Sequence, residues 1–276
     1  MSGPCPQLYT FVGHFPEAAE MAWIDGVRGA LLDIDGTLLR NDRAIPGAPE
    51  ALQRLRQRGV PFRLATNTTR RPRSATGAVL RQAGLAVEDR EILAPCTLAR
   101  RRILASGRTR AALLVPPEAR EDFEGVAEDT TRPEWVVLGD LGSGFTWERL
   151  NQAFWWIRDG AALLALHKNR FWDPGTGRPV LDAGPFVAAL EHATGTAAEL
   201  VGKPAPAFFT LALEDLGLSA GDVLVVGDDL EADHAGGAAA GCRTAIVLTG
   251  TTESGALERR GPPPDLVMDS VADLLA

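Results

Sequence analysis

Residues 27–37 read VRGALLDIDGT, and this stretch decides how the rest of the chain is interpreted. Segment 27–33 is an apolar run that ends on a carboxylate, which is typical of a buried strand. Asp33 and Asp35 leave its end together, and Gly36 permits a tight turn after them. A lone Asp after a strand is usually a turn former or a helix cap. Two carboxylates are costly to bury without a cation, so the stretch predicts a divalent-metal site at a strand end.

Strands and helices alternate in short units after this stretch, and the C-terminal tail repeats the pattern. Such alternation is typical of a parallel sheet with helical crossovers, so the predicted fold class is α/β. The predicted helices cover 49–59, 73–85, 208–218 and 232–241, and the further predicted strands cover 60–66, 222–228 and 242–250.

The middle of the chain has an alternation of its own. We interpret it as a second α/β module inserted into the first, because the candidate chemistry lies on both sides of it and not within it. This predicts an N-terminal arm over 1–24, a core domain of 25–88 plus 189–276, and a cap domain over 89–188. Within the cap, the sequence predicts strands over 111–115, 135–139 and 161–166 and helices over 92–107 and 148–160.

Composition and charge restrict the classes of function. The 276 residues carry a formal net charge of −8, which argues against a nucleic-acid partner because such proteins neutralise phosphates with Lys and Arg. Three scattered cysteines without C-x-x-C spacing argue against a zinc site or a disulfide framework. No apolar run approaches the roughly 20 residues that span a bilayer, and residues 1–20 do not resemble a secretory signal. We therefore expect a cytoplasmic protein without a membrane partner.

Two further segments have the chemistry to bind phosphate. Thr66 ends the predicted strand 60–66, and Asn67 and Thr68 follow it. A hydroxyl and backbone N–H groups can hold phosphate oxygens there. A plain helix N-cap explains the same residues, so both interpretations stay open. Lys203 lies between Gly and Pro after an apolar Val. An isolated lysine is usually a solvated surface charge, but this setting favours an inward-pointing one.

A second acidic segment follows the predicted strand 222–228. It places Asp228 and Asp233 after an apolar run, where an acidic turn is the simpler alternative. The carboxyl ends of parallel strands meet at one edge of an open sheet, and ligands bind there. We therefore expect Asp228 to lie at the same edge as Asp33 and Thr66.

In their order along the chain, these four segments resemble the four signatures of the haloacid dehalogenase (HAD) superfamily. An insert between the second and third signatures is that superfamily's larger, C2-type cap. Segments 151–154, 167–168, 181–186 and 199–204 further resemble its subfamily IIA, the NagD-like branch. The resemblance covers about residues 25–275. It implies a HAD-like Rossmannoid core with a parallel sheet, an inserted α/β cap, and a magnesium-dependent phosphatase acting on a small phosphorylated substrate.

The resemblance also implies a role for each matching residue. Asp33 is the expected nucleophile and Asp35 the expected acid and base, while Thr66 and Lys203 stabilise the transferred phosphoryl group. The expected phosphate-binding residues are Gly36, Thr37, Thr66, Asn67, Thr68 and Lys203. The expected Mg²⁺ ligands are Asp33, the backbone carbonyl of Asp35, and Asp228, with Asp233 supporting a metal-bound water or Lys203.

One position departs from that branch. Members that this chain resembles carry Ser where it has Asp35. An alcohol or sugar leaving group needs its oxygen protonated, whereas a phosphoramidate or pyrophosphate needs this less. We therefore hypothesise that this chain handles phosphate monoesters better than those relatives do.

Other polar and aromatic segments admit two interpretations each. Residues 167–170 either contact the leaving group or form a polar loop. Residues 154–157 are expected to fill the cap core or contact a second copy, and the alternative is a cage around the substrate. Relatives often pair through their caps, which leaves a homodimer open. The arginine clusters at 70–73 and 100–102 are expected on solvated helix faces, and His234 is expected to be structural.

Three other classes of function compete with the phosphatase. A phosphotransferase or mutase would reuse the same nucleophile, and a binding protein could keep the fold without catalysis. The retention of Asp33 and Lys203 argues against a binding protein. A dinucleotide-binding Rossmann protein would need G-x-G-x-x-G after its first strand, which this chain lacks.

Overall fold

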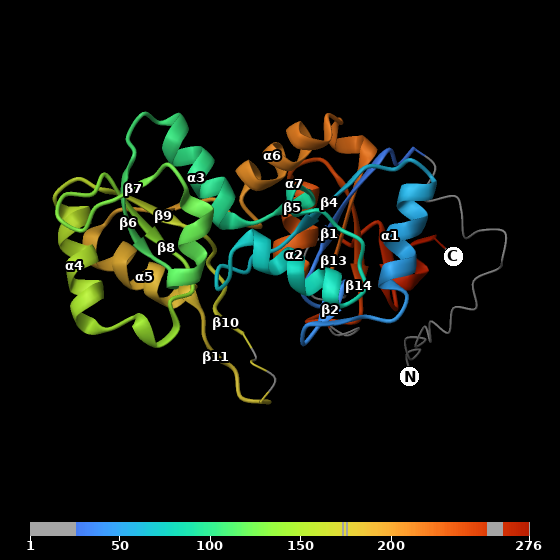
Figure 1. The fold of residues 1–276 in the computed structure, drawn as a ribbon, viewed down its shortest axis with the longest axis horizontal. Helices are drawn as coiled ribbons and strands as arrows, with labels where there is room; N and C mark the ends of the chain where they lie inside the picture. Colours follow the sequence, from blue (N-terminus) through green and yellow to red (C-terminus); the bar gives the residue numbers. More distant parts are fainter. Residues whose placement is uncertain (1–25, 173, 175, 253–261, 276) are drawn as a thin grey trace, which may run out of the picture.

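Two α/β units lie side by side in the chain, each built on a parallel sheet (Figure 1). The computed structural model describes residues 26–172, 174, 176–252 and 262–275. The predicted N-terminal arm over 1–24 lies outside the described residues. The two-unit α/β architecture confirms the predicted fold class.

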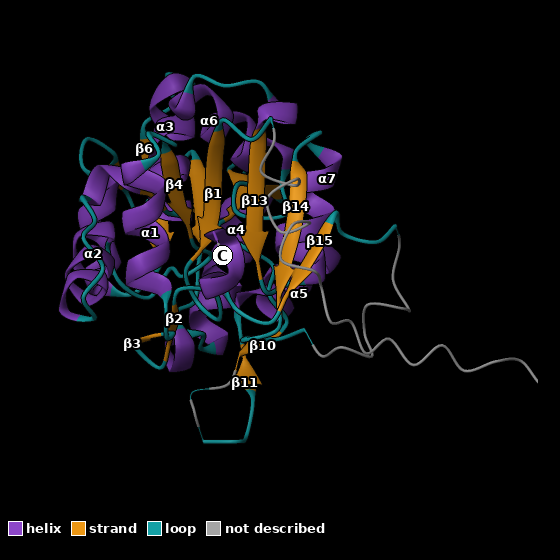
Figure 2. Cartoon of the chain, turned by 90° about the vertical axis from the view of Figure 1, so that its right-hand side faces the viewer, coloured by secondary structure: helices purple, strands orange, loops and turns teal. Residues whose placement is uncertain are grey.

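The core unit is organised around a six-stranded parallel sheet (Figure 2). Its strands are β1 (Gly29–Asp33), β4 (Phe62–Ala65), β5 (Ile92–Leu93), β13 (Val223–Gly227), β14 (Arg243–Val247) and β15 (Leu266–Met268). They are arranged in the order β15-β14-β13-β1-β4-β5. The strand that carries the first signature therefore lies inside the sheet, between β13 and β4.

Alternating side chains of β1 bury both faces of this sheet. Ala30 and Leu32 pack on one face and Leu31 on the other, which is the period of two expected of a strand. The first face is covered by α1 (Ala48–Gln57), α2 (Arg73–Gln82) and the C-terminal turn Val271–Leu275. The second face is covered by α6 (Pro206–Leu216). On the same face, α7 (Gly236–Ala239) packs against β13 and β14.

The cap unit contains a second parallel sheet, in the order β12-β9-β8-β6-β7. One face of it packs on α3, and the other packs on α4 and α5. Its elements are α3 (Pro95–Ala105), β6 (Arg110–Leu114), β7 (Ala127–Glu128), β8 (Trp135–Leu138), α4 (Trp147–Arg158), β9 (Ala162–Ala165), α5 (Ala183–Thr194) and β12 (Glu199–Leu200).

The boundaries of the cap differ from the predicted 89–188. The strand β5 pairs with β4 in the core sheet, so the cap begins at about Ala94. At the other end, α5 packs on the cap sheet and β12 pairs with β9. The backbone of Gly202 still donates to Leu166 at 2.9 Å. The chain therefore returns from the cap to the core domain directly before Lys203.

Two predicted helices also begin differently. Segment 92–107 opens as the strand β5, because Ile92 and Leu93 pair with the core sheet, and the helix starts at Pro95. Segment 232–241 is a π-helical turn over Leu230–Ala235 that leads into α7. Its first turn is capped by Asp229, whose carboxylate accepts from two backbone N–H groups.

Two hairpins complete the described fold. The first, β2 (Leu39–Arg40) with β3 (Arg43–Ala44), follows the first signature and turns through Asn41 and Asp42 at φ 52° and 58°. The second pairs β10 (Phe171–Trp172) with β11 (Val180–Leu181) and projects from the junction of the two units (Figure 1). No helix in the described part of the chain is long and apolar enough to cross a membrane.

Candidate active site

Three strand ends bring the candidate residues together at one edge of the core sheet. Asp33 is the last residue of β1, and it pairs in register with Ala65, directly before Thr66. On the other side, Leu32 is in register with Val226, two residues before Asp228. Parallel strands and short apolar runs that end together thus place these three residues side by side, as the sequence predicts.

Lys203 enters this edge from the loop that leaves the cap. Its ammonium nitrogen lies 2.6 Å from Asp33 Oδ1 and 2.5 Å from Asp233 Oδ1. All three side chains are buried, with Lys203 only 2% exposed. Burial disfavours the ammonium form, but the carboxylates of Asp233 and Asp33 raise the pKa of Lys203 above its ordinary value. Lys203 is therefore a charged group inside the protein and not a surface lysine.

The carboxylates outnumber this cation. Burial raises the pKa of Asp33 well above its usual range, and the charges of Asp233 and Asp228 raise it further against the effect of Lys203. Burial raises the pKa of Asp228 to about 6, with a further contribution from Asp233. Holding these carboxylates together costs free energy unless a further positive charge binds beside them.

The same residues fit a hard divalent cation. Carboxylate oxygens of Asp33, Asp228 and Asp233 lie within 4.8 Å of one another. Asp33 Oδ2 is buried and has no hydrogen-bond partner among the described residues. Oxygen ligands of this kind are what Mg²⁺ prefers. Both oxygens of Asp233 are already engaged, one by Lys203 and the other by the Asp229 N–H at 3.2 Å, which suits its expected support of Lys203.

Asp35 lies at the solvent side of the site. Its side chain is exposed, and the Thr66 hydroxyl donates to Asp35 Oδ2 at 3.4 Å. Loss of hydration beside neighbouring parts of the chain raises its pKa, against the opposing charges of Arg71 and Lys203. A raised pKa favours the protonated carboxyl that an acid needs.

Asn67 connects the second signature to the third. Its amide donates to the Lys203 carbonyl at 2.9 Å and accepts from the Lys203 N–H at 2.9 Å. Since the side chain is occupied in this way, its backbone N–H is the part left to meet a phosphate. Thr66 Oγ1 accepts from the Thr68 N–H at 2.9 Å, which folds the start of the loop.

Two residues of the first signature lie close against their surroundings. Gly36 has φ 92°, and a Cβ there would lie 2.5 Å from Asp228 Oδ2. Glycine is therefore required for the turn and for the approach of Asp228. Thr37 is fully buried, and its hydroxyl has no partner among the described residues. Its expected contact with phosphate stays a prediction.

The second signature continues into the cap. Thr69 Oγ1 accepts from the Asp140 N–H at 2.8 Å and lies 3.1 Å from His167 Nε2. Arg70 is 3.4 Å from Asp140 and stacks over the Trp172 ring at 4.2 Å. The sequence does not predict these contacts of Thr69 and Arg70 with the cap, because no local pattern near Thr69 shows which cap residues lie beside it. The sequence also predicts Arg70 on a solvated helix face. Arg70 is exposed, but it lies in a bend before α2 and contacts the cap.

Residues 167–170 do not behave as one group. His167 is buried, and burial lowers its pKa to about 4, so its ring is neutral. Lys168 pairs with Glu191 at 2.7 Å on the cap. Asn169 also reaches the phosphate loop, with its Oδ1 3.4 Å from Asn67 Nδ2. The cap thus meets the loop through Asn169 and the Thr69 contacts.

Residues 154–157 of the cap and His234 of the core domain contribute mainly to packing. Ile157 fills the cap core, with Phe154 and Trp156 partly buried beside it, whereas Trp155 is 55% exposed. His234 is buried, with Nδ1 2.8 Å from Thr244 Oγ1, so its structural role is confirmed.

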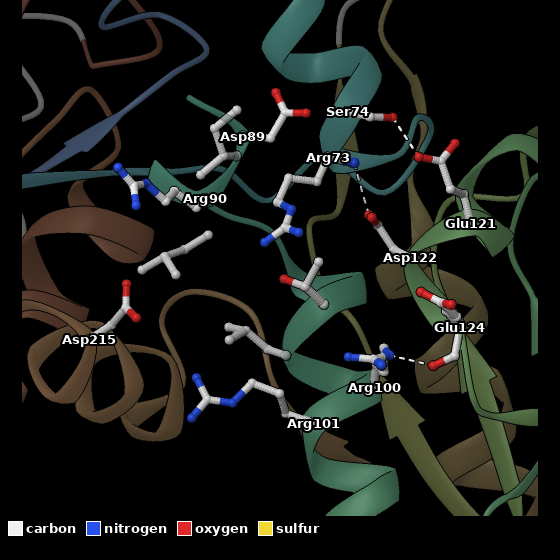
Figure 3. A pocket seen from close by; sticks show the side chains of 14 residues that line it. Arg73, Ser74, Asp89, Arg90, Arg100, Arg101, Glu121, Asp122, Glu124 and Asp215 are labelled. Atoms are coloured by element: carbon white, nitrogen blue, oxygen red, sulfur yellow. Dashed lines mark hydrogen bonds between the residues drawn. The ribbon is translucent and has the colours of Figure 1, made fainter. Parts of the chain in front are cut away.

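A cleft of about 360 Å³ lies between the two units, and none of the signature residues lines it (Figure 3). Carboxylates of the cap there bind the first residues of α2. Asp122 accepts from the Arg73 N–H at 2.9 Å, and Glu121 accepts from the Ser74 hydroxyl at 2.7 Å. Side chains of both charges line it, including Arg101 and Asp215. These two hydrogen bonds connect the cap to the helix that follows the phosphate loop.

Replacing Asn67 with Ala is expected to loosen Lys203 while leaving its charge in place. Two partly buried hydrogen bonds are lost, so we expect the free energy of unfolding to fall by about 1–3 kcal/mol and kcat to fall by roughly 10- to 100-fold. Urea unfolding and steady-state turnover of p-nitrophenyl phosphate measure these effects. Asn151→Ala in α4 is the matched control, and wild-type values for both variants would contradict this role of Asn67.

The buried Asp–Lys–Asp cluster at the carboxyl edge of a Rossmann-like sheet, with a cap inserted after the second signature, defines a HAD-type hydrolase. Comparison with known proteins agrees. The model "Haloacid dehalogenase-like hydrolase" matches residues 30–127, and a second model of HAD-like hydrolases matches residues 200–274.

Curated relatives extend the match to most of the chain. The human haloacid dehalogenase-like hydrolase domain-containing protein 2 is 38% identical over 250 residues, 91% of this chain and 95% of that protein. The human phospholysine phosphohistidine inorganic pyrophosphate phosphatase is 36% identical over 231 residues, 82% of this chain and 84% of that protein. The chain therefore belongs to the HAD superfamily of hydrolases, in its subfamily IIA.

Solved structures show the same fold. The 4-nitrophenylphosphatase of Thermotoga maritima is 32% identical, with a TM-score of 0.85 over 91% of this chain and 97% of that chain. NagD of E. coli, at 23% identity and a TM-score of 0.82 over 89% and 97%, supports the fold alone. Family and named relatives together make this chain a HAD phosphatase.

Proposed function

We propose that the chain is a Mg²⁺-dependent phosphatase that hydrolyses small phosphate monoesters through an aspartyl-phosphate on Asp33. The observation that carries this proposal is the pairing of Asp33 with Lys203 in a buried, carboxylate-rich edge of the sheet. A buried carboxylate held in one orientation by a permanent cation is suited to nucleophilic attack. The excess of negative charge around it suits a divalent cation.

In the first step, a carboxylate oxygen of Asp33 forms a bond to phosphorus, and the bond from phosphorus to the leaving oxygen breaks. Lys203 offsets negative charge beside Asp33. The Thr66 hydroxyl and the backbone N–H groups after it stabilise the equatorial oxygens. Asp35 gives its proton to the leaving oxygen, for which its exposed position and raised pKa are suited.

In the second step, the Asp35 carboxylate takes a proton from a water molecule, and the water oxygen attacks phosphorus. The bond from phosphorus to Asp33 breaks, which frees inorganic phosphate and restores both carboxyl groups. When bound, Mg²⁺ offsets the repulsion between the phosphate and Asp33. Asp33, the Asp35 carbonyl and Asp228 are the residues that would hold it.

The proposed substrate class follows from the acid role of Asp35 and from the names of the relatives. One relative is named for phospholysine, phosphohistidine and pyrophosphate, and another for 4-nitrophenyl phosphate. Asp35 supplies the acid that a sugar or alcohol leaving group needs, so we place phosphate monoesters of small metabolites first. We further propose that no nucleic acid or membrane is a partner and that the enzyme acts in the cytoplasm. A homodimer through the cap stays a proposal.

A panel of substrates tests the proposed activity. It contains sugar phosphates, nucleotides, p-nitrophenyl phosphate, phosphoramidate and pyrophosphate, each assayed for phosphate release with Mg²⁺ or with EDTA. We expect release that needs Mg²⁺ and is fastest with one of the monoesters. A folded protein that releases phosphate from none of them, or equally well with EDTA, would contradict the proposal.

Replacing Asp35 with Asn is expected to separate leaving groups by their need for an acid. For a sugar phosphate, kcat/KM should fall by roughly 10²- to 10⁴-fold, because this ratio reports the first chemical step. For p-nitrophenyl phosphate, kcat/KM should change little, while kcat falls because the second step lacks its base. Asp159→Asn, an exposed acid at the end of α4, is the control. An equal loss of kcat/KM for both substrates would rule out the acid role.

A further inference from the structure

The loop that follows β14 holds Asp228 from outside the four signatures. We name residues 249–252, which read Thr-Gly-Thr-Thr, the threonine loop. The Thr251 N–H donates to Asp228 Oδ2 at 2.5 Å. The hydroxyls of Thr251 and Thr252 both donate to the main-chain carbonyl of Asp228, at 3.1 and 2.5 Å. Since β13 and β14 are neighbours in the sheet (Figure 2), the loop meets Asp228 directly beyond the two strand ends.

The same loop reaches the first signature. The Thr249 hydroxyl donates to the Gly36 carbonyl at 2.6 Å. A Cβ at Gly250 would lie 1.9 Å from Asp228 Oδ2, and one at Gly36 would lie 2.5 Å from the same oxygen. The Asp228 carboxylate is therefore enclosed by two glycines, with its Oδ2 tied to the Thr251 N–H. These contacts restrict the orientation of the carboxylate beside Gly36.

We propose that Thr251 and Thr252 are positioning residues that set the affinity of the site for its divalent cation. This inference rests on the proposed function, because Asp228 is one of the proposed ligands. Neither threonine is proposed to touch the cation or the substrate. With Oδ2 held by the loop, Oδ1 is the oxygen presented to a cation. Partners that orient a ligand in this way are typically worth about 10- to 100-fold in metal affinity.

The test uses substitutions that remove the hydroxyl of a threonine and keep the shape of its side chain. Thr251→Val, Thr252→Val and the double variant are compared with Thr252→Ser, which restores a donor, and with Thr194→Val. Thr194 is a matched control, because its hydroxyl also donates to a main-chain carbonyl, that of Leu190 at 2.7 Å in α5. The Kd for Mn²⁺ is measured without substrate by electron paramagnetic resonance, alongside the Mg²⁺ concentration that gives half-maximal turnover.

We expect the Kd for Mn²⁺ to rise about 10-fold or more in the Val variants, to return toward wild type in Thr252→Ser, and to stay unchanged in Thr194→Val. Turnover at saturating Mg²⁺ should change far less than the Kd. Gly250→Ala keeps every hydroxyl but displaces the Asp228 carboxylate, so it should weaken Mn²⁺ binding too. It decides the question if the Val variants do not fold.

Folded variants that bind Mn²⁺ like the wild type would overturn the role of the threonine loop and leave the proposed phosphatase intact. A wild type whose phosphate release ignores both Mg²⁺ and EDTA would overturn the proposed cation itself, and the inference with it. Loss of turnover without any change in the Kd would show that the loop acts on the chemistry and not on the cation, and would also overturn the inference.

Discussion

Replacing Asp33 with Asn is expected to lower phosphate release by about 10⁴-fold or more while leaving the protein folded. The amide keeps an acceptor for Lys203 but is a much poorer nucleophile than a carboxylate, so the aspartyl-phosphate cannot form at a useful rate. Because burial and the neighbouring carboxylates raise the pKa of Asp33, removing its charge should leave the melting temperature unchanged or raise it.

Phosphate release and thermal unfolding of the same preparation measure both parts of this prediction. Asp222→Asn is the control, since that carboxylate forms only a surface pair with Arg28 at 3.3 Å. Turnover by Asp33→Asn within tenfold of the wild type would remove Asp33 from the chemistry.

Replacing Lys203 with Met is expected to affect both turnover and stability. Among the described residues, Lys203 is the cation that pairs with the carboxylates of Asp33 and Asp233, and without it both remain buried. Removing one member of a buried pair typically costs about 3–5 kcal/mol of unfolding free energy. We expect turnover to fall by about 10³-fold or more, because the charge that offsets the phosphoryl group is gone.

The stability loss should depend on pH. Without Lys203, the pKa values of Asp33 and Asp233 in the folded protein rise further above their unfolded values. A carboxyl group of this kind binds more protons in the folded state, so stability is lost as pH rises through its folded pKa. The deficit relative to the wild type should therefore be largest at pH 7 to 8 and shrink as the pH falls.

Urea unfolding of the wild type and the variant at several pH values measures this deficit. The only other lysine, Lys168, provides a matched control, because its surface pair with Glu191 is worth about 1 kcal/mol or less. A deficit for Lys203→Met that does not change with pH would contradict the account of the buried carboxylates.

Much of the site could be predicted from the sequence because its parts lie at strand ends. An apolar run that ends in Asp33, another that precedes Thr66 and a third that precedes Asp228 are local patterns. Parallel pairing then brings the three together without further information. The inward orientation of Lys203 was favoured by its neighbours Gly202 and Pro204, and its 2% exposure confirms it.

The rest depended on contacts between distant segments. The strand Ile92–Leu93 is too short to show a period and runs into a helical pattern, so it was predicted as helix. The edge strand Glu199–Leu200 is just as short, and its pairing with β9 moves the cap boundary. Asn67 binds the backbone of Lys203 across 136 residues, and no local pattern shows such a bond. The threonine loop was missed for the same reason.

The formation of an aspartyl-phosphate is tested most directly in Asp35→Asn with p-nitrophenyl phosphate. This leaving group departs without an acid, while the second step lacks its base, so the intermediate should accumulate. We expect a burst of about one equivalent of p-nitrophenolate per active site, and, after acid quenching, one phosphoryl group on the peptide that contains Asp33. Release of p-nitrophenolate and phosphate in step, with Asp33 unmodified or another side chain carrying the phosphoryl group, would contradict the account.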